Sequence, residues 1–252
     1  MFRAMVPLLA AVLLSSPALR ATDDEPKAII EKAIKAHGGA DKIEKFKGLR
    51  AKSKGKLTLP VVGETEFTQE VAMMQPDKLR ESLDLSINGK NVSIVTLVNG
   101  SDVSIEANGM AVPITDAIKD VMKDVQYMMG VGRLVNTIKD KSYEFSALGE
   151  VKVEDKPAIG VRVSSKGHKD INLFFDKKTG LLAKLEHRSK DLNTGDEFTE
   201  ERYILEYVKD DEGMQRPKRV LVKRDGKNYL EADIIESKFL ESIDDAEFKV
   251  KK

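Results

Sequence analysis

The chain has 252 residues, of which 41% are hydrophobic and 33% are charged, a balance typical of a folded globular protein and not of a disordered or membrane-embedded one. Its 42 basic and 42 acidic residues cancel, which argues against nucleic acid as a partner, because neutralising phosphates needs a basic surface. Cysteine is absent, which excludes a thiol nucleophile, a Cys-ligated metal, a disulfide and a lipid-modified cysteine.

The first residues predict an export signal. A short basic start and an apolar run over 5–14 precede small residues that offer cleavage after Ala18 or Ala21, which is the layout of a secretory signal peptide. The apolar run is about half as long as a membrane span, so an uncleaved anchor is the less favoured alternative. We therefore expect a signal peptide at 1–21, a periplasmic or secreted mature chain, and one domain over 22–252.

Two short helices are expected next. Pro26 suits the first turn of a helix that runs to about His37, and Gly38 and Gly39 end it. A second short helix begins at Ala40. The His-Gly-Gly sequence also resembles the oxyanion loop of esterases, but no Gly-x-Ser-x-Gly elbow accompanies it, so a helix end is the favoured interpretation.

Most of the remaining chain has the pattern of β-strands. Apolar and polar residues alternate with a period of two, and Asn-Gly and similar turns separate the segments. The expected strands are 51–59, 65–73, 79–87, 91–98, 102–107, 143–148, 150–153, 158–165, 170–175, 181–188, 199–208, 218–223 and 228–238. So many short strands in succession predict an antiparallel meander that forms a barrel, an open barrel or a sandwich.

One long amphipathic helix interrupts the strands at 114–129. Its apolar residues recur every three or four positions, and charged residues fill the opposite face. Thr115 is the expected N-cap, and Gly130 and Gly132 are expected stops or hinge points, with a helical continuation over 134–138. A large sheet with one apolar face needs a cover. We expect this helix to provide it, either as a mobile lid or as a fixed part of the core.

Residues that carry chemistry are scarce, so we expect no catalytic residue, no cofactor and no metal site. His168 and His187 lack the spacing of a metal-ligand pair, and we interpret both as surface residues. The oxygen-rich segment 191–197 lacks the spacing of an EF-hand loop and is better explained as a hairpin loop. The Gly130-Val-Gly132 sequence follows a helix, whereas a phosphate loop opens one.

Methionines cluster around the long helix and the strands before it. Met is flexible and polarizable, so a surface rich in Met adapts to varied apolar partners. Ordinary core filling and a ligand-adaptable lining both remain open for this group, which comprises Met73, Met74, Met110, Met122, Met128 and Met129.

Several segments, in their order along the chain, resemble the LolA/LolB-like superfamily of exported bacterial proteins. They are Ala28–Ile43, Lys52–Lys56, Gln75–Arg80, Phe175–Lys184, Gly213–Lys218 and Ile243–Phe248. The resemblance implies a mainly β fold with helices (α+β), in which a large curved antiparallel half-barrel carries helices over its concave face. It also implies a cavity for acyl chains of lipoproteins or other lipids, with no reaction catalysed. The chain has no cysteine for a lipid anchor of the LolB kind.

Our leading hypothesis is a non-enzymatic periplasmic carrier that binds lipid or lipoprotein acyl chains between the sheet and the long helix. The expected lining is apolar and consists of Phe67, Val71, Met73, Leu83, Leu85, Met122, Val125, Met129, Phe175 and Leu185. The alternative is an envelope protein-interaction or sensor module that recognises unfolded or lipidated proteins through a sheet edge. A hydrolase is the least favoured class, because no nucleophile–base pair stands in a motif. We expect neither a nucleic-acid partner nor an integral membrane span.

Overall fold

The computed structural model describes residues 24–60, 62–191 and 194–250, so the expected signal peptide lies outside the described residues. The helices are α1 (Asp24–Ala36), α2 (Ala40–Lys45), α3 (Asp116–Gly132), α4 (Val135–Lys139) and a 3-10 turn, η1 (Asp245–Phe248). None of the described helices is long and apolar enough to cross a bilayer.

All the described strands belong to one antiparallel sheet. They are β1 (Gly48–Leu59), β2 (Gly63–Met74), β3 (Lys78–Ile87), β4 (Lys90–Asn99), β5 (Asp102–Ala107), β6 (Met110–Val112), β7 (Tyr143–Val153), β8 (Lys156–Ser165), β9 (Ile171–Asp176), β10 (Leu182–Lys190), β11 (Glu197–Lys209), β12 (Gln215–Arg224) and β13 (Lys227–Leu240). Their spatial order is β6-β5-β4-β3-β2-β1-β13-β12-β11-β10-β9-β8-β7.

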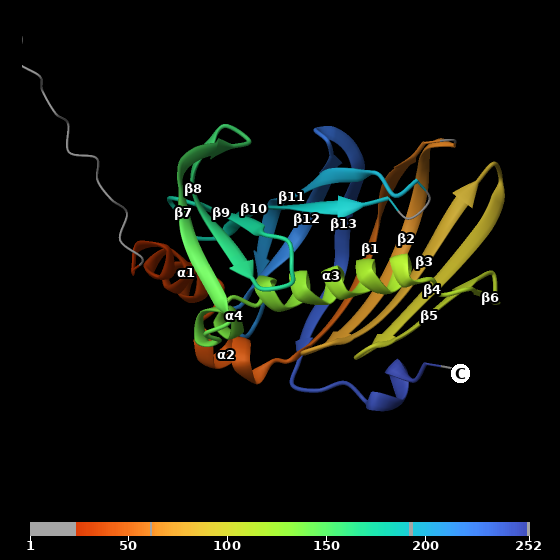
Figure 1. Cartoon of the computed structure of the whole chain (residues 1–252), viewed down its shortest axis with the longest axis horizontal. Helices are drawn as coiled ribbons and strands as arrows, with labels where there is room; N and C mark the ends of the chain where they lie inside the picture. The colour runs from red at the N-terminus through yellow and green to blue at the C-terminus, as the bar shows by residue number, and fades with distance from the viewer. Residues whose placement is uncertain (1–23, 61, 192–193, 251–252) are drawn as a thin grey trace, which may run out of the picture.

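This order consists of two meanders joined at the middle of the sheet. The first meander is β1–β6 and the second is β7–β13. The first strand, β1, pairs with the last, β13, and this pair joins the two meanders inside the sheet. The connection from β6 to β7 then has to span from one sheet edge to the other, and α3 and α4 make it (Figure 1). The sheet curls around α3 into an open half-barrel, which confirms the expected fold class.

Cross-strand pairs define the two faces of the sheet. Phe67 lies opposite Gly55 of β1 and Leu85 of β3, so these residues share one face, while Lys54 points to the other face. Following the register through β13 to β9 places Leu173 on the same face as Phe67. We call the face toward α3 the inner face and the opposite one the outer face.

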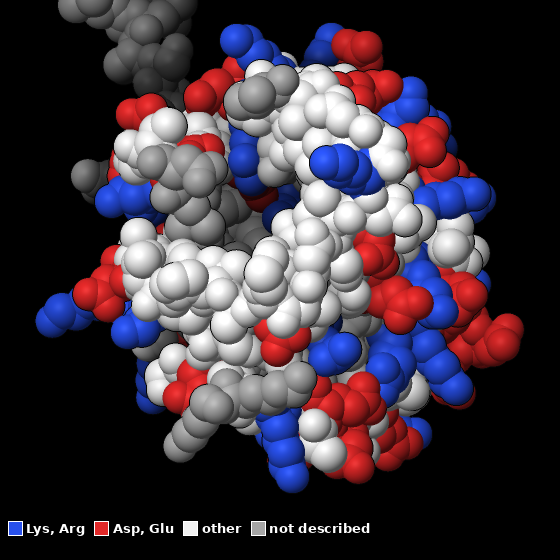
Figure 2. Space-filling model, turned by 90° about the vertical axis from the view of Figure 1, so that its right-hand side faces the viewer, with Lys and Arg blue, Asp and Glu red and all other residues white. Residues whose placement is uncertain are grey.

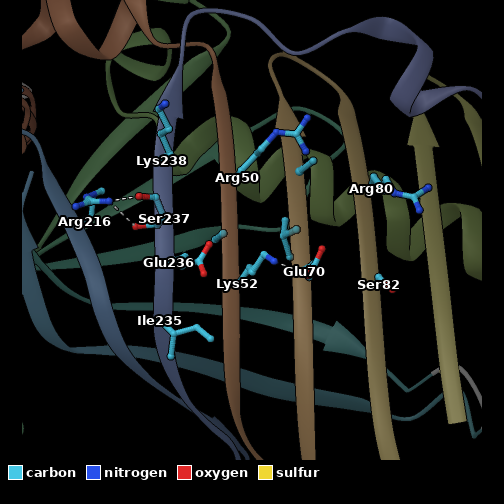
Figure 3. A pocket seen from close by; sticks show the side chains of 13 residues that line it. Arg50, Lys52, Glu70, Arg80, Ser82, Arg216, Ile235, Glu236, Ser237 and Lys238 are labelled. Carbon is cyan, nitrogen blue, oxygen red and sulfur yellow. Dashed lines mark hydrogen bonds and ion pairs between the residues drawn. The ribbon is translucent and has the colours of Figure 1, made fainter. Parts of the chain in front are cut away.

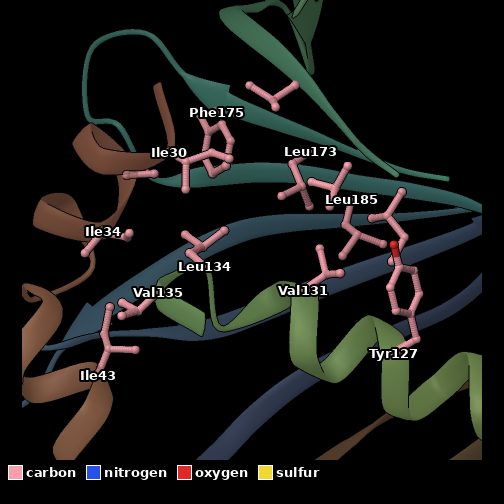
Figure 4. Packing of buried hydrophobic residues seen from close by; sticks show 14 of the residues in the cluster. Ile30, Ile34, Ile43, Tyr127, Val131, Leu134, Val135, Leu173, Phe175 and Leu185 are labelled. Carbon is pink, nitrogen blue, oxygen red and sulfur yellow. The ribbon is translucent and has the colours of Figure 1, made fainter. Parts of the chain in front are cut away.

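The main core lies between the inner face of β7–β10 and helices α1, α2 and α4 (Figure 4). Ile30 of α1, Val135 of α4 and Leu173 of β9 are at most 1% exposed, and Val131 at the end of α3 is fully buried. Burying a side chain of this size contributes about 1.5–3 kcal/mol. We call β7–β10 with these three helices the filled region.

Most expected strands are present, with differences at specific points. The short edge strand β6 was not predicted, and the two expected strands 143–148 and 150–153 are one strand, β7, with an irregularity between Ala147 and Gly149. In the β3–β4 turn, Asn88 and Gly89 have φ of 50° and 74°, as a two-residue type I′ turn requires.

The end of the long helix also differs from the prediction. Gly130 does not stop α3, but Gly132, the other expected stop, is its last residue. The expected continuation is a separate helix, α4, because Leu134 adopts a left-handed φ of 57° between the two. The side chain of Thr137 in α4 donates to the carbonyl oxygens of Gly130 and Val131, each at 3.3 Å. These hydrogen bonds connect α4 to the end of α3.

Candidate ligand-binding site

Helix α3 is held across the ends of β2–β5. Thr115 is its N-cap, as predicted, since its Oγ1 accepts a hydrogen bond from the backbone N–H of Ile118. Gln126 Nε2 donates to the carbonyl oxygens of Asp77 at 2.9 Å and Gly100 at 2.8 Å. These carbonyls belong to the β2–β3 and β4–β5 turns, so Gln126 ties the middle of the helix to the rim of the sheet.

The C-terminal part of α3 is fixed more firmly. The ring of Tyr127 stacks on His168 at 4.0 Å between centroids and lies 6.0 Å from Tyr143. Burial raises the pKa of Tyr127 to about 12. The guanidinium of Arg133 donates to the carbonyl oxygen of Ile43, which joins the end of α3 to α2.

The inner face of β1–β5 is apolar but only partly covered. Phe67 and Leu85 pair across β2 and β3 and are 3% and 6% exposed. Val71, Met73 and Leu83 share that face and are half-buried. The three expected lining residues on α3 are also half-buried, namely Met122, Val125 and Met129. We call β1–β5 with residues 116–129 of α3 the open region.

The other two expected lining residues lie elsewhere. Phe175 is 1% exposed and Leu185 is 6% exposed, and both pack in the core of the filled region with residues of α1 and α3. They share the inner face with Phe67 but are already covered. The structure therefore brings eight of the ten expected residues to the open region and places two in the packed core.

Hollows in the surface adjoin α3. Viewed from the end that carries β6, the molecule has a central hollow that uncharged residues border on one side and in which charged residues are visible (Figure 2). A groove of about 580 Å³ lies between α3, the β2–β3 turn and Tyr143, and another of about 450 Å³ lies between α3 and the β8–β9 and β10–β11 loops. The helix thus has open space along both flanks.

A short polar row crosses the apolar inner face of the open region. Ser53 Oγ donates to Gln69 Oε1 at 3.0 Å, and Gln69 Nε2 donates to the carboxylate of Glu81. Thr96 of β4 lies opposite Glu81. Within the described residues Glu81 has no ion-pair partner, so its half-buried carboxylate presents uncompensated negative charge toward the inside.

A second inner carboxylate has the opposite environment. Glu200 is 5% exposed and lies 2.9 Å from Arg202, 3.4 Å from Arg224 and 3.6 Å from His187. Burial acts to raise the pKa of Glu200, but His187 and Arg202 outweigh it, so the pKa is held well below its ordinary value. The guanidinium of Arg224 also covers the ring of Tyr229 at 3.5 Å, next to the apolar cluster of the open region.

Sequence reasoning missed this charged cluster and misplaced the histidines. His187 was expected at the surface, but its side chain is 11% exposed and faces Glu200 across the β10–β11 pair. His168 is half-buried in the Tyr127 stack. The alternation of side chains along a strand could have placed His187 on the inner face, since His187 and Leu185 are two residues apart and must share a face.

The remaining sequence motifs have structural roles. His37 Nδ1 lies 2.8 Å from the carbonyl oxygen of Ala33, and Gly39 N donates to Ile34 O, so the His-Gly-Gly sequence ends α1 as predicted. Among the residues that the structure describes, no three His, Asp or Glu side chains lie close enough to hold a metal ion. Part of the 191–197 loop lies outside the described residues.

Solved structures with the same fold exist at low sequence identity. A LolA superfamily protein from Nitrosomonas europaea aligns with a TM-score of 0.53 at 12% identity, over 89% of this chain and 97% of that one. A DUF1329 family protein from Desulfovibrio piger aligns with a TM-score of 0.52 at 13% identity, over the same shares. No protein-family model and no curated protein matches the sequence. The chain has a LolA-like fold, which confirms the resemblance at the level of architecture.

Proposed function

We propose that this protein is a non-enzymatic carrier that binds the acyl chains of lipids or lipoproteins against the inner face of the open region. The observation that carries the proposal is a set of large apolar side chains that the fold leaves half-buried, on both the sheet and the helix above it. A monomer gains stability by covering such residues completely, so an incomplete cover on one region indicates a surface kept for a ligand. The LolA-like fold supports the same function.

The driving force would be removal of methylene groups from water. Each buried methylene contributes about 0.8 kcal/mol, so a long acyl chain binds well without a specific hydrogen bond. The half-buried methionines Met73, Met122 and Met129 suit this task, because flexible thioether side chains fit apolar ligands of varied shape. Among the alternatives for these methionines, a ligand-adaptable lining is the one we favour.

Binding of a fluorescent fatty-acid probe tests the proposal. We expect the wild-type protein to bind the probe and Leu83→Glu to lose most of that binding, because the new carboxylate would have to be desolvated next to the acyl chain. Ile235→Glu is the matched control, since Ile235 is an apolar residue on β13 that is 55% exposed.

Native mass spectrometry of protein purified from a bacterial periplasm gives the complementary result. The proposal expects bound species with the masses of lipids, and fewer of them in Leu83→Glu than in Ile235→Glu. A wild-type protein that carries no lipid and takes up no acyl probe would show that the half-buried residues serve packing alone.

The alternative function, peptide capture at a sheet edge, has less support. The long edge strand β7 exposes Glu144, Glu150 and Lys152, and charges on an edge strand oppose pairing with another chain. The opposite edge strand, β6, has only three residues. We further propose that the carrier works in the periplasm, on the basis of the signal-like N-terminal sequence.

A further inference from the structure

A groove of about 610 Å³ crosses the outer face of the sheet, on the side away from α3 (Figure 3). Strands β13, β1, β2 and β3 form its floor. Its charged lining has five cations and two carboxylates, namely Arg50, Lys52, Arg80, Arg216, Lys238, Glu70 and Glu236. The groove is therefore basic on a chain whose total charge is balanced.

Some of these cations already have partners. Lys52 Nζ lies 2.9 Å from Glu70, and the guanidinium of Arg216 donates to the carbonyl oxygen of Ser237. Arg80 and Lys238 are exposed, and within the described residues their side chains have neither an ion pair nor a hydrogen bond. Two uncompensated cations thus stand on β3 and β13, at opposite sides of the groove.

The neighbouring part of the same face is occupied by an acidic segment of the chain itself. Residues 241–248 end in η1, whose Glu247 pairs with Arg50 and whose Asp245 lies 2.6 Å from Lys78. Ile243 and Phe248 anchor the segment, at 6% and 0% exposure, against Ala72 and Met74 of β2.

This arrangement shows which contacts the outer face makes with a segment of its own chain. Carboxylates of an irregular segment pair with Arg and Lys from the strands, while an apolar side chain fills the space between them. The open groove continues the same chemistry, because it offers two further cations, Arg80 and Lys238, together with the exposed Ile235.

We propose that this groove is a docking site for an acidic peptide segment of a partner protein, bound through Arg80 and Lys238 with an apolar side chain against Ile235. A peptide fits better than a membrane surface, because the site is a recess in the middle of a sheet. In addition, the neighbouring part of the same face already binds a peptide segment of the chain, residues 241–248. The site is separate from the inner face and does not depend on acyl binding.

The probe is a fluorescein-labelled peptide with the sequence of residues 241–248, tested on the full-length protein by fluorescence anisotropy. We expect saturable binding that weakens as salt is raised, and no binding of a control peptide in which every Asp and Glu is replaced by its amide. The double variant Arg80→Glu/Lys238→Glu should weaken binding at least about tenfold, which corresponds to about 1.4 kcal/mol.

The double variant Lys90→Glu/Lys227→Glu is the matched control, because it changes the charge equally at two exposed lysines outside the groove. It should bind the peptide with an affinity within about twofold of wild type, since charges outside the binding site change mainly the rate of association and only weakly. Thermal unfolding checks that both variants are folded.

Three results would overturn the proposal. They are equal loss in both double variants, unchanged binding in Arg80→Glu/Lys238→Glu, and binding of phosphatidylglycerol vesicles through these residues without binding of the peptide. The last result would assign the groove to anionic lipid headgroups instead.

Discussion

The filled and open regions present the same kind of surface to the inside of the half-barrel, but the chain covers them differently. In the filled region, Val161, Val163 and Leu173 are fully buried beneath the helices. In the open region, Val71 and Leu83 occupy equivalent inward positions and are half-buried. At these apolar positions the difference comes from what lies above the sheet, although the open region also carries the polar row of Ser53, Gln69 and Glu81.

The cover explains this contrast. Helices α1, α2 and α4 pack directly on the inner face of β7–β10, whereas α3 reaches the turns of the open region through Gln126. A region packed to completion contributes stability, and a region left half-covered is free to contribute binding. Substitutions in the two regions separate these two contributions.

The largest expected effect is on the core. Phe175→Ala should lower the free energy of unfolding by about 3–5 kcal/mol, because it leaves a cavity in the filled region. Leu83→Ala should cost only about 1 kcal/mol, since its side chain is half-buried. Urea denaturation followed by circular dichroism measures both. Equal losses would mean that the two regions are packed alike.

The two inner carboxylates provide the second contrast. Glu200→Gln should lower the free energy of unfolding by about 2–3 kcal/mol, below the usual cost of breaking a fully buried pair, because Arg202 and Arg224 retain some contact with water. Glu81→Gln should have a much smaller effect, since Glu81 has no ion pair with any described residue.

The same contrast has a pH dependence. The pKa of Glu200 is depressed in the folded protein, so its contribution to stability is present above its ordinary value of 4.5 and is lost as the pH falls below it. The difference in stability between wild type and Glu200→Gln should therefore shrink in acid. A difference that stays constant to low pH would contradict the ion-pair assignment.

A smaller effect is expected from loosening the attachment of α3 to the sheet. Gln126→Ala removes two hydrogen bonds to the rim of the open region, and each is worth about 1 kcal/mol. We expect a modest loss of stability and faster release of a bound acyl probe in stopped-flow measurements. Unchanged release would indicate that α3 does not control access to the inner face.

The smallest effect is expected from Tyr127. Its pKa is raised to about 12 from an ordinary value of 10.0, so its neutral form stabilises the fold below pH 10 and that contribution is lost as the pH rises toward 12. Ultraviolet titration of Tyr127→Phe against wild type should remove a phenol that ionises late. Removal of a phenol with an ordinary pKa would show that the stack opens.

Much of this fold follows from sequence pattern. Alternation located the strands because side chains on a strand point to opposite faces, and the spacing of apolar residues located α3. The pairing of β1 with β13 could not be predicted in this way, because no local pattern records which distant strands meet. The burial of Phe175 and Leu185 was missed for the same reason. The alternation pattern correctly places both on the inner face, but only the packing of α1 determines that they are covered.

Photo-crosslinking with a diazirine-labelled fatty acid, followed by peptide mapping, tests the central claim most directly. We predict adducts on residues of β2–β4 and on residues 116–129 of α3, and few on β8 and β9. Adducts confined to the outer face, or spread evenly over both faces, would contradict the proposal that the open region binds acyl chains.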